Sequence, residues 1–140
     1  MYLTITRRYE FCSAHWLPGV PDGHKCKSQH GHNYAVEVTI AGMQNPATGF
    51  IIDFWVLDKI VQPIVDRVDH HSLNDIEGLE NPTAENIAVW FYDQLNLCSS
   101  LFEVEKIRIY ETKDCWSQIV QSHPERKVKC RQHQISKRNW

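Results

Sequence analysis

The chain has 140 residues, of which 42% are hydrophobic and 23% are charged, and its formal net charge is −2. These values are those of one ordinary globular domain, and they exclude disordered and fibrous classes. No apolar run approaches the roughly 20 residues that cross a bilayer, so we expect no membrane partner. The first residues lack the basic and apolar regions of a signal peptide, and the five cysteines are irregularly spaced. Both features favour a reducing, cytoplasmic location.

The charge is unevenly distributed along the chain. Residues 1–122 hold nine Lys and Arg against sixteen Asp and Glu, a net −7, whereas residues 123–140 hold six against one, a net +5. The acidic body argues against nucleic acid as the main partner, because phosphate binding depends on Lys and Arg. We predict one catalytic domain over 1–122 and a solvated, poorly ordered basic tail over 123–140. Contact of the tail with RNA or a neighbouring subunit is the alternative.

Alternating apolar residues predict two strands in the first third of the chain. Over 3–13 one side carries Leu3, Ile5, Tyr9 and Phe11. A loop rich in Gly and Pro follows over 18–23. The alternation is clearer over 32–40, where Glu37 and Thr39 face one way and four apolar residues face the other: Tyr34, Val36, Val38 and Ile40.

Two helices and two more strands are predicted beyond residue 50. Asp53 is placed to cap a helix whose apolar residues recur at helical spacing as far as Val68, and Pro63 should kink it or loosen one turn. Residues 82–85 open a second helix with Thr83 as its cap. Strands are expected over 104–111 and, shorter, over 116–121. The order predicts an α+β fold, a four-stranded antiparallel sheet with two helices packed on one face.

Three histidines have the spacing of a metal site. His30 and His32 are two apart in a predicted strand, so both side chains lie on one face. His15 ends the first strand, and strand pairing can bring it alongside. Three His ligands with an open fourth position are typical of catalytic zinc. Three unrelated histidines on a sheet are the simpler interpretation, and the nearby Cys26 shifts the balance towards a metal.

Cys26 lies in a charged loop just before the second strand. The lysines on either side, Lys25 and Lys27, and a nearby dication would favour its thiolate form. A small buried cysteine is the alternative, which a charged loop disfavours. Cys12, three residues before His15, is a rival zinc ligand, but the alternation places its side chain on the opposite side of the strand from His15.

Carboxylates mark two further candidate positions. Asp69 and His70 follow the first helix, and a carboxylate beside an imidazole can fix its tautomer in acid–base catalysis, although such pairs also occur simply at helix ends. Glu111 shares the inward side of Ile107 and Ile109. It is either solvated at the strand end or positioned to bind a donor-rich ligand, and a planar guanidine-like group would fit it in a bidentate manner.

In combination, these motifs resemble the 6-pyruvoyltetrahydropterin synthase superfamily, and its 6-carboxytetrahydropterin synthase branch in particular. Six stretches match in family order over roughly residues 3–112: 11–15, 23–32, 49–54, 69–74, 81–85 and 111–112. The three residues between Cys26 and His30 are like the carboxy branch, whereas the pyruvoyl branch has a longer gap. Residues 113–140 match nothing in the family.

The resemblance implies the tunnelling fold, assembled as a homohexamer with sites between subunits. It implies dihydroneopterin triphosphate as the substrate, with 6-carboxytetrahydropterin, acetaldehyde and triphosphate as products. It assigns zinc to His15, His30 and His32, proton abstraction to Cys26, a relay to Asp69 and His70, and pterin anchoring to Glu111. We add Thr83 and Lys25 as candidate substrate-binding residues.

Two other functions remain open from the sequence. A pyruvoyl-forming enzyme acting on the same pterin triphosphate is the nearer alternative. The more distant alternative is a non-catalytic module whose structural zinc would be bound by Cys12, His15, Cys26 and one of His30 or His32.

Overall fold

A computed structural model describes residues 1–98 and 102–121 of the protein. The elements in chain order are β1 (Tyr2–His15), η1 (Lys25–Lys27), β2 (His30–Met43), α1 (Phe54–Asp66), η2 (Leu73–Asp75), α2 (Ala84–Cys98), β3 (Glu103–Tyr110) and β4 (Trp116–Val120). The predicted basic tail over 123–140 lies outside the described residues, so its separation from a domain over 1–122 stays a prediction.

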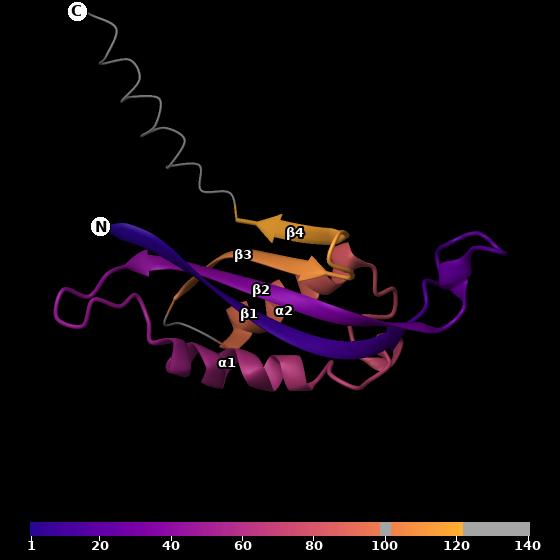
Figure 1. Ribbon diagram of the computed structural model, residues 1–140, viewed down its shortest axis with the longest axis horizontal. Coiled ribbons are helices and arrows are strands. Elements are labelled where there is room, and N and C mark those ends of the chain that lie inside the picture. The colour runs from indigo at the N-terminus through magenta and orange to yellow at the C-terminus, as the bar shows by residue number, and fades with distance from the viewer. Residues whose placement is uncertain (99–101, 122–140) are drawn as a thin grey trace, which may run out of the picture.

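The four strands form one antiparallel sheet in the order β1-β2-β3-β4. Both helices lie on the same face of this sheet, and β1 and β2 are its two longest strands, with β1 at one edge (Figure 1). This arrangement confirms the predicted α+β architecture. β1 and β2 pair along their whole length, from Tyr2 opposite Met43 to His15 opposite His30.

The core forms between the sheet and the helices, as the alternation predicts. Tyr9, Phe11, Tyr34 and Val36 are buried there together with apolar residues of α1 and α2. On the other face of β2, Thr39 is also buried, although no helix covers that face (Figure 1). Its hydroxyl lies 2.8 Å from that of Thr6 on β1. Neighbouring strands on both sides therefore cover small side chains on a central strand, even without a helix above them.

The helices begin where the capping residues predict. The Asp53 carboxylate accepts a hydrogen bond of 2.7 Å from the Trp55 amide, and the Thr83 hydroxyl accepts one of 3.3 Å from the Asn86 amide. α1 contains Pro63 and ends at Asp66, although the apolar spacing continues to the buried Val68. No helix among the described residues has the length and apolar character needed to span a membrane.

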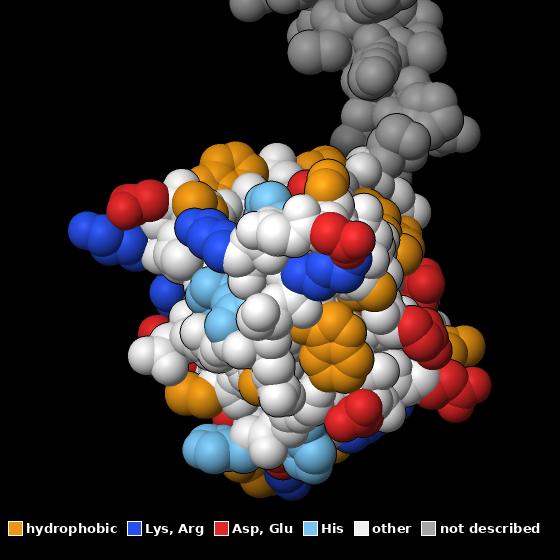
Figure 2. Space-filling view, turned by 90° about the vertical axis from the view of Figure 1, so that its right-hand side faces the viewer, with side chains coloured by type: hydrophobic (Ala, Val, Ile, Leu, Met, Phe, Trp, Pro, Cys, Tyr) orange, Lys and Arg blue, Asp and Glu red, His pale blue; other side chains and the backbone are white. Residues whose placement is uncertain are grey.

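The sheet has two chemically different ends. At one end the chain turns from Met43 into the loop over 44–53, and at the other β1 ends at His15 and β2 begins at His30. Figure 2 shows this second end, where histidine side chains reach the surface near lysine and arginine side chains. The candidate chemistry of the sequence is therefore concentrated at one end of the sheet.

Candidate metal centre and adjoining cavity

Strand pairing brings the three predicted histidines together. His15 is opposite His30 in the register, and His32 is opposite Ser13, so the three imidazoles project from neighbouring positions of the inner face. Their candidate ligand nitrogens all lie within 4.8 Å of one another. His15 is only 1% exposed, and the other two are partly buried. The spacing of His30 and His32 alone places them on one face, and the pairing of β1 with β2 brings His15 beside them.

Backbone carbonyls fix two of the rings so that their Nε2 atoms face each other. His15 Nδ1 lies 2.9 Å from the Pro82 carbonyl oxygen, and His30 Nδ1 lies 2.8 Å from that of Ser28. A carbonyl only accepts, so each Nδ1 carries the hydrogen and each Nε2 has a free lone pair. The two Nε2 atoms are 3.0 Å apart. Facing lone pairs repel at this distance unless a cation lies between them.

His32 provides the third nitrogen. Its Nε2 lies 3.2 Å from Glu111 Oε1 but makes no well-aligned hydrogen bond, and the atom is buried. A buried nitrogen without a hydrogen bond is costly unless another partner binds it. Tetrahedral zinc with Zn–N bonds of about 2.0 Å places neighbouring nitrogens roughly 3.3 Å apart. The three imidazole nitrogens, two of them 3.0 Å apart, therefore form a donor set of the kind that binds a metal ion such as zinc.

The protonation of the site also favours metal binding. Burial is the main effect that lowers the pKa of His15, and the nearby His30 adds to it, while the Pro82 carbonyl and Glu111 oppose it. Burial likewise lowers the pKa of His32, against Glu111, with a further lowering from the positive charge of Lys25. A histidine binds metal in its neutral form, so a lowered pKa keeps these ligands ready at neutral pH.

Cys26 and Lys25 lie in the one-turn helix η1, close in sequence to the metal-site end of β2. Cys26 is partly buried, its amide donates to His24 Nδ1 at 3.1 Å, and its carbonyl accepts from the Leu17 amide at 2.8 Å. Leu17 comes two residues after His15, so this bond ties the Cys26 loop to the chain that leaves the histidine cluster. Lys25 is exposed.

Glu111 and Thr83 line one cavity of about 300 Å³ between the start of α2 and the β3–β4 turn. β3 ends at Tyr110, one residue before the predicted end, yet Glu111 keeps the inward direction and reaches His32. The turn fixes its backbone, because the Cys115 carbonyl accepts from the Glu111 amide at 3.0 Å. The cavity therefore has a carboxylate directly beside the candidate metal site.

Asp69 and His70 form the predicted pair but lie elsewhere. Asp69 Oδ2 is 2.9 Å from His70 Nδ1, and the His70 side chain is 79% exposed. The Cys12 amide, which donates to Asp69 Oδ1 at 2.8 Å, holds the pKa of Asp69 below its usual range, with a further contribution from His70. His70 has a φ of 59°, a left-handed conformation that is strained for a residue other than glycine.

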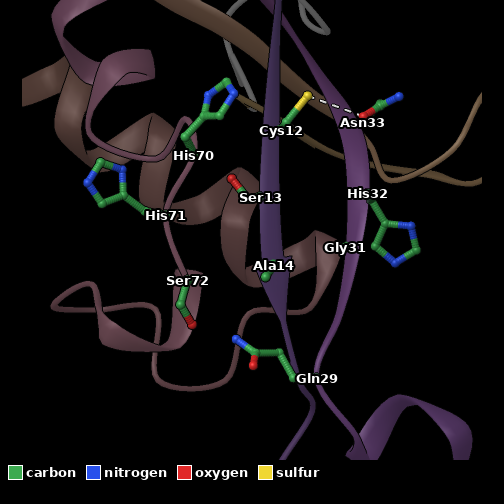
Figure 3. Close-up of a pocket in the computed structure, with 10 residues that line it drawn as sticks. All are labelled: Cys12, Ser13, Ala14, Gln29, Gly31, His32, Asn33, His70, His71 and Ser72. Carbon is green, nitrogen blue, oxygen red and sulfur yellow. Dashed lines mark hydrogen bonds between the residues drawn. The ribbon is translucent and has the colours of Figure 1, made fainter.

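Within the described part of the chain, the contacts of this pair do not include Cys26, which is also absent from the lining of the cavity beside His70. His70 and His32 both line a cavity of about 560 Å³. In Figure 3, however, the His70 ring lies on one side of β1 and β2 and the His32 ring on the other. Among the described residues, Asp69 and His70 contact the backbone of Cys12, through Asp69 Oδ1 and the His70 amide.

The Cys12 thiol points away from the histidine cluster, as the alternation predicts. It donates to Asn33 Oδ1 at 3.2 Å, on the opposite face of the sheet (Figure 3). It is therefore not one of the groups that could hold the same ion as the three histidines.

Two features of the site escaped sequence reasoning. One is the Pro82 carbonyl that orients His15, which no side-chain pattern reveals. The other is Tyr34, which is 1% exposed, lies edge-on to the rings of His15 and His32, and has a buried hydroxyl without a hydrogen bond. Burial raises its pKa above the usual value. Its place two residues after His32, on the same side of the strand, was the available signal.

The sequence is similar to that of known pterin enzymes. The sequence model of the 6-pyruvoyl tetrahydropterin synthase family matches residues 4–122. A Synechocystis protein named 6-carboxy-5,6,7,8-tetrahydropterin synthase is 38% identical over 96 residues, which cover 65% of this chain and 73% of that protein. A Rickettsia bellii protein of the same name is 30% identical and covers 84% of this chain and 99% of its own length.

The fold is likewise similar to a solved structure. The 6-pyruvoyl tetrahydropterin synthase of Caenorhabditis elegans superimposes with a TM-score of 0.80 at 29% sequence identity, over 87% of this chain and 97% of that one. The four-stranded sheet with two helices on one face is thus the tunnelling fold expected from the motifs.

Proposed function

This chain belongs to the 6-pyruvoyl tetrahydropterin synthase family, and we propose that it is a zinc-dependent lyase of the 6-carboxytetrahydropterin branch. It would convert dihydroneopterin triphosphate to 6-carboxytetrahydropterin, acetaldehyde and triphosphate. The observation that carries the proposal is the pairing of a three-histidine cluster with Glu111, whose carboxylate lies 3.2 Å from His32. The names of the Synechocystis and Rickettsia bellii relatives support the choice of branch.

His15, His30 and His32 would hold the zinc ion. Bound there, it would acidify the side-chain oxygens of the substrate and stabilise negative charge that develops on them. The carbonyls of Pro82 and Ser28 keep the two ring hydrogens on Nδ1, and thereby keep the Nε2 atoms available as ligands.

Glu111 would anchor the pterin ring. The guanidine-like edge of a pterin offers two parallel N–H groups, which a carboxylate accepts in a bidentate manner. Because Glu111 borders both the 300 Å³ cavity and His32, the ring bound there would place its side chain towards the metal site. Thr83 lines the same cavity, and Lys25 would contribute positive charge for the triphosphate.

Cys26 would remove a proton from a side-chain carbon of the substrate, which eases loss of triphosphate before the carbon–carbon bond is cleaved. We propose that Asp69 and His70 serve the Cys26 of a neighbouring subunit in a homo-oligomer, with a hexamer expected. The support is that His70 is largely exposed, and that within the described chain this pair contacts Cys12 instead of Cys26.

The decisive experiment is to incubate zinc-loaded protein with dihydroneopterin triphosphate and to follow the products by mass spectrometry. The proposal expects acetaldehyde and 6-carboxytetrahydropterin in equal amounts. Formation of 6-pyruvoyltetrahydropterin without acetaldehyde would assign the chain to the pyruvoyl-forming alternative. Zinc bound through sulfur, seen by X-ray absorption, with no product at all would favour a structural-zinc module.

A further inference from the structure

The side chain of Asn74, at the centre of η2, pairs with the backbone of Trp16 as a strand partner would. Its Oδ1 accepts from the Trp16 amide at 3.0 Å, and its Nδ2 donates to the Trp16 carbonyl at 2.8 Å. The second Nδ2 hydrogen is directed to the Glu80 carbonyl at 3.3 Å. One partly buried amide thus uses both of its donors and its acceptor on the backbones of two separate segments.

Both segments adjoin groups of the histidine cluster. Trp16 follows His15, and Glu80 lies two residues before Pro82, whose carbonyl accepts from His15 Nδ1 at 2.9 Å. Asn74 therefore connects the backbone of a candidate metal ligand with the segment that carries the acceptor for that ligand. The chain before Asn74 is tied to the same strand, because the Ala14 amide donates to the His71 carbonyl at 3.1 Å.

We propose that Asn74 is a positioning residue of the metal centre. It does not touch the ion; it sets the distance between the His15 ring and the Pro82 carbonyl, and so keeps His15 Nε2 directed at His30 Nε2. The inference rests on the proposed zinc site and goes beyond it by naming a group outside the ligands that determines metal affinity. Groups that orient metal ligands typically change affinity by about 10- to 100-fold when they are removed.

Asn45 provides a matched control at the other end of the sheet. Its Oδ1 accepts from the amides of Ala47 and Thr48 at 2.8 and 3.4 Å, so it too fixes backbone through a side-chain amide. It follows Met43, which is opposite Tyr2 and therefore lies at the far end of β2 from His30. Loss of this side chain should change the conformation of that turn and leave the positions of the three histidines unchanged.

The test measures the zinc dissociation constant of the full-length protein by competition with a chromogenic chelator. Asn74→Ala should raise it about 10- to 100-fold, whereas Asn45→Ala should leave it unchanged. In a His15→Ala background, which binds zinc more weakly, adding Asn74→Ala should change the constant by less than about twofold, because the positioned ligand is gone. If Asn74→Ala does not fold, Asn74→Ser tests the same pattern with a smaller expected loss.

Three results would overturn the inference: a folded Asn74 variant with wild-type zinc affinity, equal losses for the Asn45 and Asn74 variants, or a loss that persists undiminished in the His15→Ala background. Failure of the wild-type protein to bind zinc would instead overturn the proposed metal site itself. The two failures are therefore distinguishable.

Discussion

The proposed role of Cys26 depends on the chemical reactivity of its thiol, whereas the histidines and Glu111 are proposed to bind metal and substrate. As the base, it should be dispensable for zinc and substrate binding but not for turnover. Cys26→Ala should lose about 10²–10⁴-fold in kcat, the usual contribution of general base catalysis, with zinc affinity retained. Cys26→Ser should be nearly as slow, since a hydroxyl is much harder to deprotonate than a thiol. Single-turnover kinetics on zinc-loaded protein measure this directly.

Cys98 gives the matched control for this experiment. It is an exposed thiol at the end of α2, so Cys98→Ala should keep the wild-type rate. Because His70 is proposed to act on the same proton, adding His70→Ala to Cys26→Ala should cost little beyond either change alone. A Cys26→Ala protein with near wild-type turnover would remove this residue from the mechanism.

Glu111 should contribute to pterin binding through its charge. Glu111→Gln keeps the shape of the side chain and loses the bidentate, charge-assisted acceptor, which is worth about 1.5–3 kcal/mol. We therefore expect affinity for a non-reactive pterin to fall roughly 10- to 100-fold. Fluorescence titration of neopterin is a suitable measurement, with the exposed Glu77→Gln as the control. Equal neopterin affinity in Glu111→Gln and wild type would show that the charge of this carboxylate does not contribute to pterin binding.

At the level of whole elements, one carboxylate connects α1 to β1. Asp58 Oδ1 accepts from the Tyr9 hydroxyl at 2.7 Å and from Arg7 Nε at 3.1 Å. The Tyr9 hydrogen bond is the main effect that lowers the pKa of Asp58 from its ordinary 3.8, and Arg7 lowers it further, while burial opposes them. The folded state therefore prefers the ionised carboxylate.

This preference makes part of the stability depend on pH. A depressed carboxyl pKa stabilises the fold above the unfolded value of 3.8, and that contribution is lost as the pH falls through the lower, folded value. Asp58→Asn should thus be less stable than wild type at pH 7, by at most about 1 kcal/mol because the pair is partly exposed. The difference should shrink below roughly pH 4.

Urea unfolding at a series of pH values tests this expectation. Asp66→Asn is the control on the same helix, since the described contact of Asp66 is a hydrogen bond from Gln62 of α1 itself. A pH-independent gap between Asp58→Asn and wild type would attribute the effect to packing and not to charge.

At the scale of the whole molecule, the separation of His70 from Cys26 predicts complementation between subunits. Cys26→Ala and His70→Ala proteins should each retain no more than about 1% of wild-type turnover. Co-assembled at random, they should recover about one quarter of the wild-type sites, because each site would take Cys26 from one subunit and His70 from another. Co-expression with two different affinity tags isolates the mixed oligomers for assay.

The control mixes Cys26→Ala with Cys26→Ser, a pair in which no intact site can form. Purified mixed oligomers of the first pair that stay as inactive as this control would place both groups in one subunit or exclude His70 from the reaction.

The sequence by itself determined the elements and part of the site, because these depend on chain neighbours. Alternation every second residue sets which side of a strand is buried, so the His-Gly-His spacing put His30 and His32 on one face and turned Cys12 away from His15. Local caps likewise placed the helix starts after Asp53 and Thr83, since each cap bonds an amide only two or three residues away.

Only the tertiary structure decided how these elements meet. The approach of Glu111 to His32 requires β3 to pair with β2, and the bond from His15 to the Pro82 carbonyl requires the start of α2 to lie against the end of β1. The position of Asp69 and His70 beside Cys12 depends on how the chain runs alongside the edge strand β1 after α1. These are contacts between segments far apart in the chain, and their geometry follows from packing of the whole core, which no local pattern encodes.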